Sequence, residues 1–263
     1  TNTTAFDGLR RTFQATGAGS RLDLRNLTSI TNGQNWDTLF KIEALAGGQV
    51  DLRSVVQITE PSTGDTRYRR VDVTADGAGS VVNLSALTTF VDRNGGSTTG
   101  TNLYSSLVPQ NGGTIQAGAL TTLTGVNLVL NGTGSIPTPQ ITTLNGNSAL
   151  TLSGSGASYD FAGLATATTS VISLAAAAAS TPNLASIDSS SFFVSGGSTL
   201  ALPAATSYTN ATVFNDSTRT FQATGAGSRL DLRNLTSMTN GQNYNTLFEV
   251  EALAGGQVDL RSV

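Results

Sequence analysis

The sequence predicts an all-β fold, a right-handed parallel β-solenoid in which short strands and tight turns form coils that stack on one another. Three observations predict it. The stretch FQATGAGSRLDLRNLTS at residues 13–29 returns unchanged at residues 221–237. A shorter spacing, near 21 residues at its minimum, runs through the chain. Apolar and polar residues alternate, as in Leu22-Asp23-Leu24, which is the period of a strand with one buried face.

The long repeat has a period of 208 residues. Residues 1–55 align without a gap to residues 209–263, and 11 of the 55 positions differ. Four of the differences form one run, at residues 7–10, whereas substitutions at apolar positions keep their apolar character. We therefore predict a single continuous solenoid over residues 1–263. Residues 1–208 form one repeat, residues 209–263 begin the next, and both belong to a longer array.

Within the repeat, one apolar column marks eight coils. It passes through Leu27, Val55, Leu87, Leu120, Ile141, Leu164, Leu184 and Ala205, and returns at Leu235. Two more apolar columns keep the same register, one five residues earlier and one three residues later. A coil of this length is too short for a repeat that contains helices. It matches one rung of a parallel β-solenoid, and neighbouring rungs lie about 4.8 Å apart.

The run LAAAAAS at residues 174–180 is the one stretch that favours a helix in isolation, because alanine has the highest helix propensity. The coil register nevertheless passes through it unbroken. We predict a tightly packed rung here, with a local helix as the alternative.

Composition excludes several classes of function. The chain has no Cys and no His, which removes Cys nucleophiles, Ser-His triads, His-ligated metals and disulfides. Its net charge of -3 argues against nucleic acid, which requires a basic face. No apolar run reaches the length of about 18 residues that a membrane-spanning helix needs. We expect no catalytic residue, no metal and no cofactor.

A polar column follows the same register. It contains Asp23, Asp51, Asn83, Gln116, Asp160 and Asp231, with arginine two residues later at 25, 53 and 233. The interpretation we favour is an outward ladder in which the aspartates and arginines of neighbouring rungs screen one another. The alternative is a set of paired carboxylates that cleave polysaccharide, as in β-helical lyases and hydrolases.

A hydroxyl column adds a further alternative, an ice- or surface-binding face. Seven of its eight members carry a hydroxyl; the column is Ser29, Gln57, Thr89, Thr122, Thr143, Thr166, Ser186 and Ser207. Ice binding would require two parallel ranks of outward threonine. Because apolar residues flank the Thr-Ser pairs at a spacing of three, we expect a corner where the hydroxyls cap backbone groups instead.

Some coils are longer because residues are inserted after the same corner, at 31–38, 59–68, 91–105 and 209–218. The insertions would project from one edge. Aromatic rings among Asn and Asp are typical of glycan binding, since sugar rings stack on flat apolar faces. The alternative is that these rings fold back over the solenoid wall or pack against a neighbouring filament. The candidate contact residues are Asn32, Asn35, Trp36, Asp37, Tyr68, Asp92, Arg93, Tyr104 and Tyr244.

The segments ATGAGSRLDLRNLTSI (15–30) and ADGAGSVVNLSALTTF (75–90) resemble the β-helical repeats of giant secreted or surface-attached proteins of environmental bacteria, planctomycetes among them. They are also similar to those of filamentous-haemagglutinin-type adhesins. The resemblance implies an extracellular or cell-surface fibre, filament or adhesin stalk with no catalytic residues. The expected partners are further copies of the chain, end to end or side by side, and surface glycans.

Overall fold

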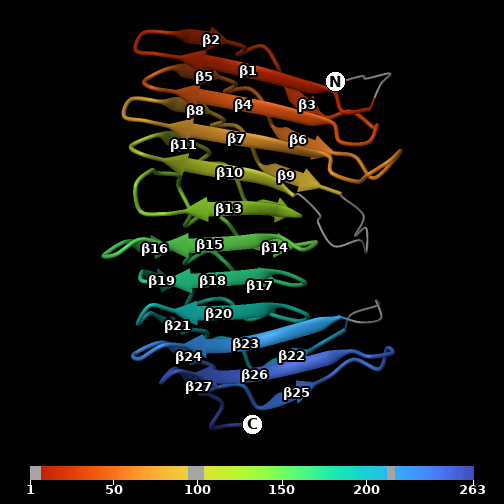
Figure 1. Cartoon of the computed structure of the whole chain (residues 1–263), viewed down its shortest axis with the longest axis vertical. Coiled ribbons are helices and arrows are strands. Elements are labelled where there is room, and N and C mark those ends of the chain that lie inside the picture. The colour runs from red at the N-terminus through yellow and green to blue at the C-terminus, as the bar shows by residue number, and fades with distance from the viewer. Residues whose placement is uncertain (1–6, 94–103, 212–216) are drawn as a thin grey trace. The chain divides into compact units, whose positions relative to one another are not determined.

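The computed structural model describes residues 7–93, 104–211 and 217–263. The fold is all-β and is built from parallel sheets, as predicted (Figure 1). The predicted insertions at 91–105 and 209–218 lie partly outside the described residues. The chain forms two compact parts, Thr1–Pro137 and Thr138–Val263, and the single continuous solenoid over residues 1–263 stays a prediction.

In the N-terminal part, each of the first four coils contributes one strand to each of three sheets, and the next coil begins with β13. The first sheet contains β1 (Arg10–Thr16), β4 (Leu39–Leu45), β7 (Arg70–Asp76), β10 (Ser105–Gln110) and β13 (Val126–Leu130). The second contains β2 (Arg21–Asp23), β5 (Gln49–Asp51), β8 (Val81–Asn83) and β11 (Thr114–Gln116). The third contains β3 (Ser29–Thr31), β6 (Gln57–Glu60), β9 (Thr89–Asp92) and β12 (Thr122–Thr124). In Figure 1 the front strands of this part run leftward and the rear strands return rightward as the chain descends, which is the right-handed sense.

The C-terminal part repeats this three-strand plan. Its first sheet contains β15 (Ala149–Ser153), β18 (Val171–Ala175), β20 (Ser191–Ser195), β23 (Thr218–Thr224) and β26 (Leu247–Leu253). At the second position, β16 (Ser158–Asp160) and β19 (Ala178–Ser180) form a two-stranded sheet. Strands β21 (Thr199–Ala201), β24 (Arg229–Asp231) and β27 (Gln257–Asp259) form a three-stranded one. The third position holds β14 (Thr143–Asn145) beside β17 (Thr166–Ala167), and β22 (Ser207–Thr209) beside β25 (Ser237–Thr239).

The predicted register is confirmed wherever the predicted columns fall in paired strands. Leu22 lies opposite Val50 in the second sheet, and Ile30 lies opposite Ile58 in the third. The interior is filled by the apolar columns, and side chains alternate between buried and part-exposed along strands such as β7. The packing of the coils follows from this alternation, since successive strand residues point to opposite faces.

The alanine run is a rung, as predicted. Residues 174–175 end β18, residues 178–180 form β19, and the corner between them places Ala176 at a φ of 52°. Stacking geometry has overridden helix propensity here, because β18 and β19 both pair with strands of neighbouring coils.

Corners between the first and second strands bring backbones very close together. A Cβ built on Gly48 would lie 2.1 Å from the carbonyl oxygen of Ala15 in the preceding coil. Gly256, at the same place in the second copy of the repeat, would meet Ala223 at 2.2 Å. Glycine is required at these positions because no side chain fits between the stacked turns.

Candidate functional site

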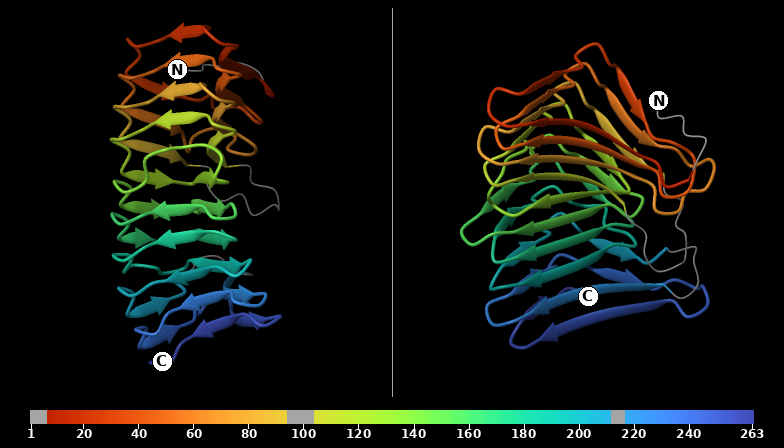
Figure 2. Two further views of the ribbon diagram at one scale, coloured as in Figure 1. Left: turned by 90° about the vertical axis from the view of Figure 1, so that its left-hand side faces the viewer. Right: turned by 45° about the horizontal axis from the view of Figure 1, so that its top comes forward.

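The candidate contact residues lie on loops that leave the third strand of a coil and enter the first strand of the next. In the N-terminal part, loop 32–38 connects β3 to β4 and loop 61–69 connects β6 to β7. Figure 2 shows these loops projecting from the same edge of that part. We call them the loop edge.

The loops of this edge stack on each other as the coils do. The backbone N–H of Asp65 donates to the carbonyl of Gln34 at 2.9 Å, and that of Asp37 donates to the carbonyl of Arg67 at 3.1 Å. A Cβ on Gly64 would lie 2.1 Å from the Gln34 carbonyl oxygen. The loop edge is therefore an extension of the solenoid ladder, held at fixed positions by its own backbone.

Two of the candidate aromatic residues meet across this stack. The rings of Trp36 and Tyr68 lie edge to face, with centroids 5.9 Å apart and planes at 78°. Trp36 keeps 38% of its surface exposed. The pair therefore presents part of an aromatic surface to solvent beside polar loop residues.

A buried ion pair lies beneath the loops. Nε of Arg69 lies 2.9 Å from Oε1 of Glu60, and both side chains are fully buried. The two atoms are close enough for strong attraction but are not aligned as a hydrogen bond. The Arg69 guanidinium also donates to the carbonyls of Gly33 and Thr63, each at 3.0 Å, and to that of Pro61. One arginine thus ties both loops together.

Asn32 completes this cluster. Its side-chain amide donates to Oε2 of Glu60 at 2.6 Å and to the carbonyl of Thr38 at 2.9 Å. Burial raises the pKa of Glu60 to about 8, while Arg69 and Asn32 act in the opposite direction and Asp92 adds to the rise. Asn32 was predicted to be a contact residue, but it is buried and fixes the base of the loops instead.

Asp92 is likewise buried rather than presented to solvent. One of its carboxylate oxygens accepts hydrogen bonds from the backbone and the hydroxyl of Ser105, both at 2.8 Å. The Ser105 hydroxyl in turn accepts from the backbone N–H of Val71. Asp92, the last residue of β9, therefore holds the start of β10, which is the first strand of the next coil.

The remaining candidates lie nearer the surface. Asn35 and Tyr104 are half-buried, and Asp37 accepts from Arg10 at 3.4 Å. Arg93 is exposed, and its backbone N–H donates to the carbonyl of Glu60. Tyr244, in loop 240–246 of the C-terminal part, is exposed. The described structure brings Trp36 and Tyr68 together, with Asn35 and Asp37 on either side of Trp36 in the same loop, whereas Asn32 and Asp92 are buried.

Sequence reasoning missed Glu60 and Arg69. A signal for Glu60 was present, because it stands two residues after the inward-facing Ile58 and strand periodicity puts it on the same buried face. Arg69 stands two residues before the inward-facing Val71, so the same alternation puts it on the buried face, but nothing in the pattern indicates the two loops that it joins.

The aspartate column forms the predicted polar ladder. In four coils the Nε of the arginine two residues later donates to the aspartate at 2.9 Å, namely Arg25 to Asp23, Arg53 to Asp51, Arg233 to Asp231 and Arg261 to Asp259. Arg21 connects neighbouring coils by reaching Asp51 at 2.7 Å. The side-chain hydrogen bond from Arg25 holds the pKa of Asp23 near 2, well below its ordinary value.

The hydroxyl column differs in part from the expected corner. In three coils the first residue of the pair does cap the backbone: Thr88 donates to the carbonyl of Val56 at 3.0 Å, Thr121 to that of Thr88 at 3.3 Å and Thr236 to that of Thr206 at 3.0 Å. The second residue belongs to the following strand and faces outward, as Ser29 does in β3. The corner therefore ends before this residue, because the strand already begins at it, as β3 does at Ser29 and β9 at Thr89.

Among the described residues there is no group of acidic side chains arranged to hold a metal ion. The part of the chain that the structure describes also has no helix long and apolar enough to cross a membrane. No protein-family model, curated protein or solved structure matches the chain significantly.

Proposed function

We propose that the chain is part of an extracellular or cell-surface fibre, filament or adhesin stalk, built from tandem 208-residue solenoid repeats with loops along one edge for contacts. One observation carries the proposal. The pairing of β1 with β4, which begins at Arg10 and Leu39, recurs 208 residues later as the pairing of β23 with β26, which begins at Thr218 and Leu247.

The junction between repeats supports the same conclusion. Strands β20, β21 and β22 belong to the last coil of one repeat, and they pair with β23, β24 and β25 of the next. The coils therefore stack across the boundary between repeats in the same way as they do within a repeat. A protein built like this can be lengthened in one direction by adding repeats. The partners in this proposal are further copies of the chain, and the Trp36–Tyr68 surface is the place where a glycan would stack.

The test is immuno-electron microscopy of the native cells with antibody against residues 1–208. We expect labelled thin fibres on which gold recurs at intervals of about 38 Å or its multiples, because eight rungs rise about 4.8 Å each. Label confined to compact particles in the medium or the periplasm would contradict the proposal. Polysaccharide cleavage would then be tested, although the ladder aspartates are engaged by arginine.

A second candidate function is ice or surface binding, which one observation favours. In the C-terminal part, Ser207 and Thr209 lie opposite Ser237 and Thr239, and all four are exposed. They form two short ranks of outward hydroxyls. Thermal hysteresis that disappears in a Thr209→Lys variant would support this candidate, and absence of hysteresis in the unmodified chain would exclude it.

A further inference from the structure

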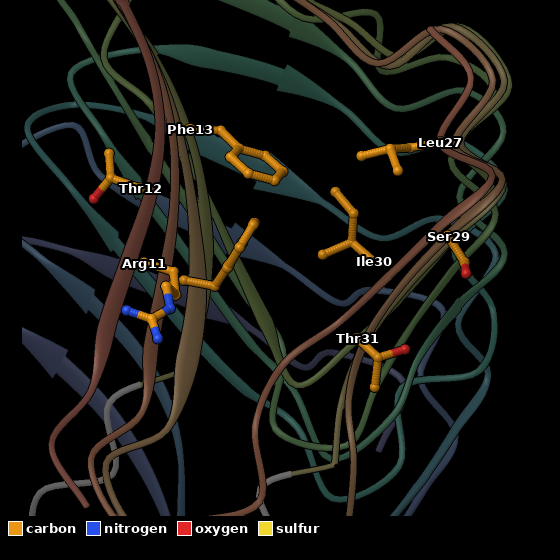
Figure 3. Close-up of a pocket in the computed structure, with 8 residues that line it drawn as sticks. Arg11, Thr12, Phe13, Leu27, Ser29, Ile30 and Thr31 are labelled. Atoms are coloured by element: carbon orange, nitrogen blue, oxygen red, sulfur yellow. The ribbon is translucent and has the colours of Figure 1, made fainter. Parts of the chain in front are cut away.

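A pocket opens at β1, which is the edge strand of its sheet. The cavity measures about 280 Å³. Phe13, Leu27 and Ile30 point into it, whereas Thr12 and Ser29 point away (Figure 3). The residues that line it are Arg11, Thr12, Phe13, Leu27, Ser29, Ile30, Thr31 and Phe40.

The second copy of the repeat shows what this pocket is shaped to hold. Phe13 and Phe40 form an edge-to-face pair, with centroids 4.8 Å apart at 84°. Their counterparts Phe221 and Phe248 form the same pair at 4.9 Å and 86°. In the second copy the ring of Tyr208 covers that pair, 4.8 Å from Phe221 and 5.0 Å from Phe248.

The two sites are built from nearly the same residues. Of the lining residues, only Ile30 changes in the second copy, where Met238 replaces it. The phenylalanine pair has the same geometry in the second copy, where the tyrosine covers it, as in the first copy, where it does not. The pocket beside Phe13 is therefore formed before any ring enters it, which lowers the cost of binding one.

The coil that contains Tyr208 also contacts the next coil through its three strands. Strands β20, β21 and β22 pair with β23, β24 and β25 through Phe192–Phe221, Leu200–Leu230 and Tyr208–Met238. The Tyr208 hydroxyl donates to the carbonyl of Ser190 at 3.1 Å. The acceptor for this buried hydroxyl therefore comes from the same repeat as the tyrosine and not from the pocket. Ser191 accepts from the backbone N–H of Thr220 at 3.0 Å.

We propose that the pocket is the socket for a tyrosine at the Tyr208 position of a preceding copy of the 208-residue repeat. Residues 191–209 of that copy add strands to β1, β2 and β3 in the register Phe192–Phe13, Leu200–Leu22 and Tyr208–Ile30. The proposal rests on the tandem array proposed above and names the surface through which consecutive repeats join. Strand addition of this kind satisfies an exposed sheet edge while the ring fixes the register.

The test uses the full chain with residues 138–208 fused ahead of residue 1. Because the chain has no Cys, a single Leu27→Cys substitution reports on the socket through its rate of labelling by a thiol reagent. We expect labelling at least about tenfold slower in the fused chain than in the original one, since the site then reacts only through local opening. Leu235→Cys in the original chain, where Tyr208 already covers the site, gives the fully protected rate.

Two controls keep the result specific. Val56→Cys, at an exposed residue away from the socket, should label equally fast in both chains. Tyr208→Ala in the added segment should restore much of the Leu27→Cys rate. Equal Leu27→Cys labelling in both chains would overturn the proposal even if fibres exist on cells, and protection would support the socket even if no fibres were found.

Discussion

The two copies of the repeat have nearly the same sequence and opposite patterns of burial. Leu39 in the first copy is fully buried, whereas its counterpart Leu247 is 47% exposed. Phe13 is partly exposed, whereas its counterpart Phe221 is fully buried. The difference follows the neighbours, because β4 lies between β1 and β7 and β23 lies between β20 and β26. Burial in this protein is therefore a property of the stack of coils and not of the residue.

The largest expected effect comes from the phenylalanine pair. Phe221→Ala should lower the free energy of unfolding by about 3–5 kcal/mol, because it leaves a cavity among Tyr208, Phe192 and Phe248. Phe13→Ala should cost less than half as much, since its ring is already open on one side. Urea unfolding of both variants measures the difference. Equal losses would show that the neighbouring coil does not decide how much each ring stabilises the fold.

The buried ion pair of the first copy should come next. Arg69→Ala should cost about 3–5 kcal/mol, because it leaves Glu60 buried without its partner and frees two loops. Arg67→Ala is the matched control. Its guanidinium is about half exposed and pairs with Asp65 at the surface, so its loss should cost less than about 1 kcal/mol. If the two variants unfold at the same denaturant concentration, Arg69 does not hold the loop edge.

The loop aromatic residues should show a smaller difference. Trp36→Ala removes an aromatic pair with Tyr68, whose interaction adds about 0.5–1.5 kcal/mol to the area buried. Tyr244→Ala removes a ring that is 77% exposed, so stability should change by no more than about 0.5 kcal/mol. Thermal unfolding of the two variants measures the stability that each one loses. A larger loss of stability for Tyr244→Ala than for Trp36→Ala would show that the contact between Trp36 and Tyr68 does not stabilise the loops.

The ladder aspartates should behave alike in both copies, because their partners lie in their own and the preceding coil. Arg53 and Arg21 lower the pKa of Asp51, and Arg261 and Arg229 lower that of Asp259. A carboxyl whose pKa is lowered on folding stabilises above its unfolded value of 3.8 and loses that contribution as the pH falls through the folded pKa.

Asp51→Asn and Asp259→Asn should therefore each flatten the loss of stability below pH 4, to a similar and small extent. Asp160→Asn is the control, since Ala162 replaces the arginine of that coil. Urea unfolding between pH 2 and pH 7 provides the measurement. If the pH dependence of stability became flatter in only one of the two variants, the aspartate–arginine pairs would depend on which coils lie next to them.

Most of the fold could be predicted from the sequence because each coil repeats the same columns. Leu22 over Val50 and Ile30 over Ile58 follow from spacing alone, and the alanine run followed the register rather than its propensity. What could not be predicted depends on neighbours in space. No column identifies Arg69 as the tie between two loops, and identical residues such as Phe13 and Phe221 differ only in what lies above them.

The central claim is that coil stacking passes unbroken through the boundary between repeats. The most direct test is to measure particle length by electron microscopy for chains with one, two and three copies of residues 1–208 ahead of residues 209–263. The length should grow by about 38 Å with each added repeat, at constant width. Repeats that separate as beads on flexible linkers, or that fold back so that the width grows instead, would contradict it.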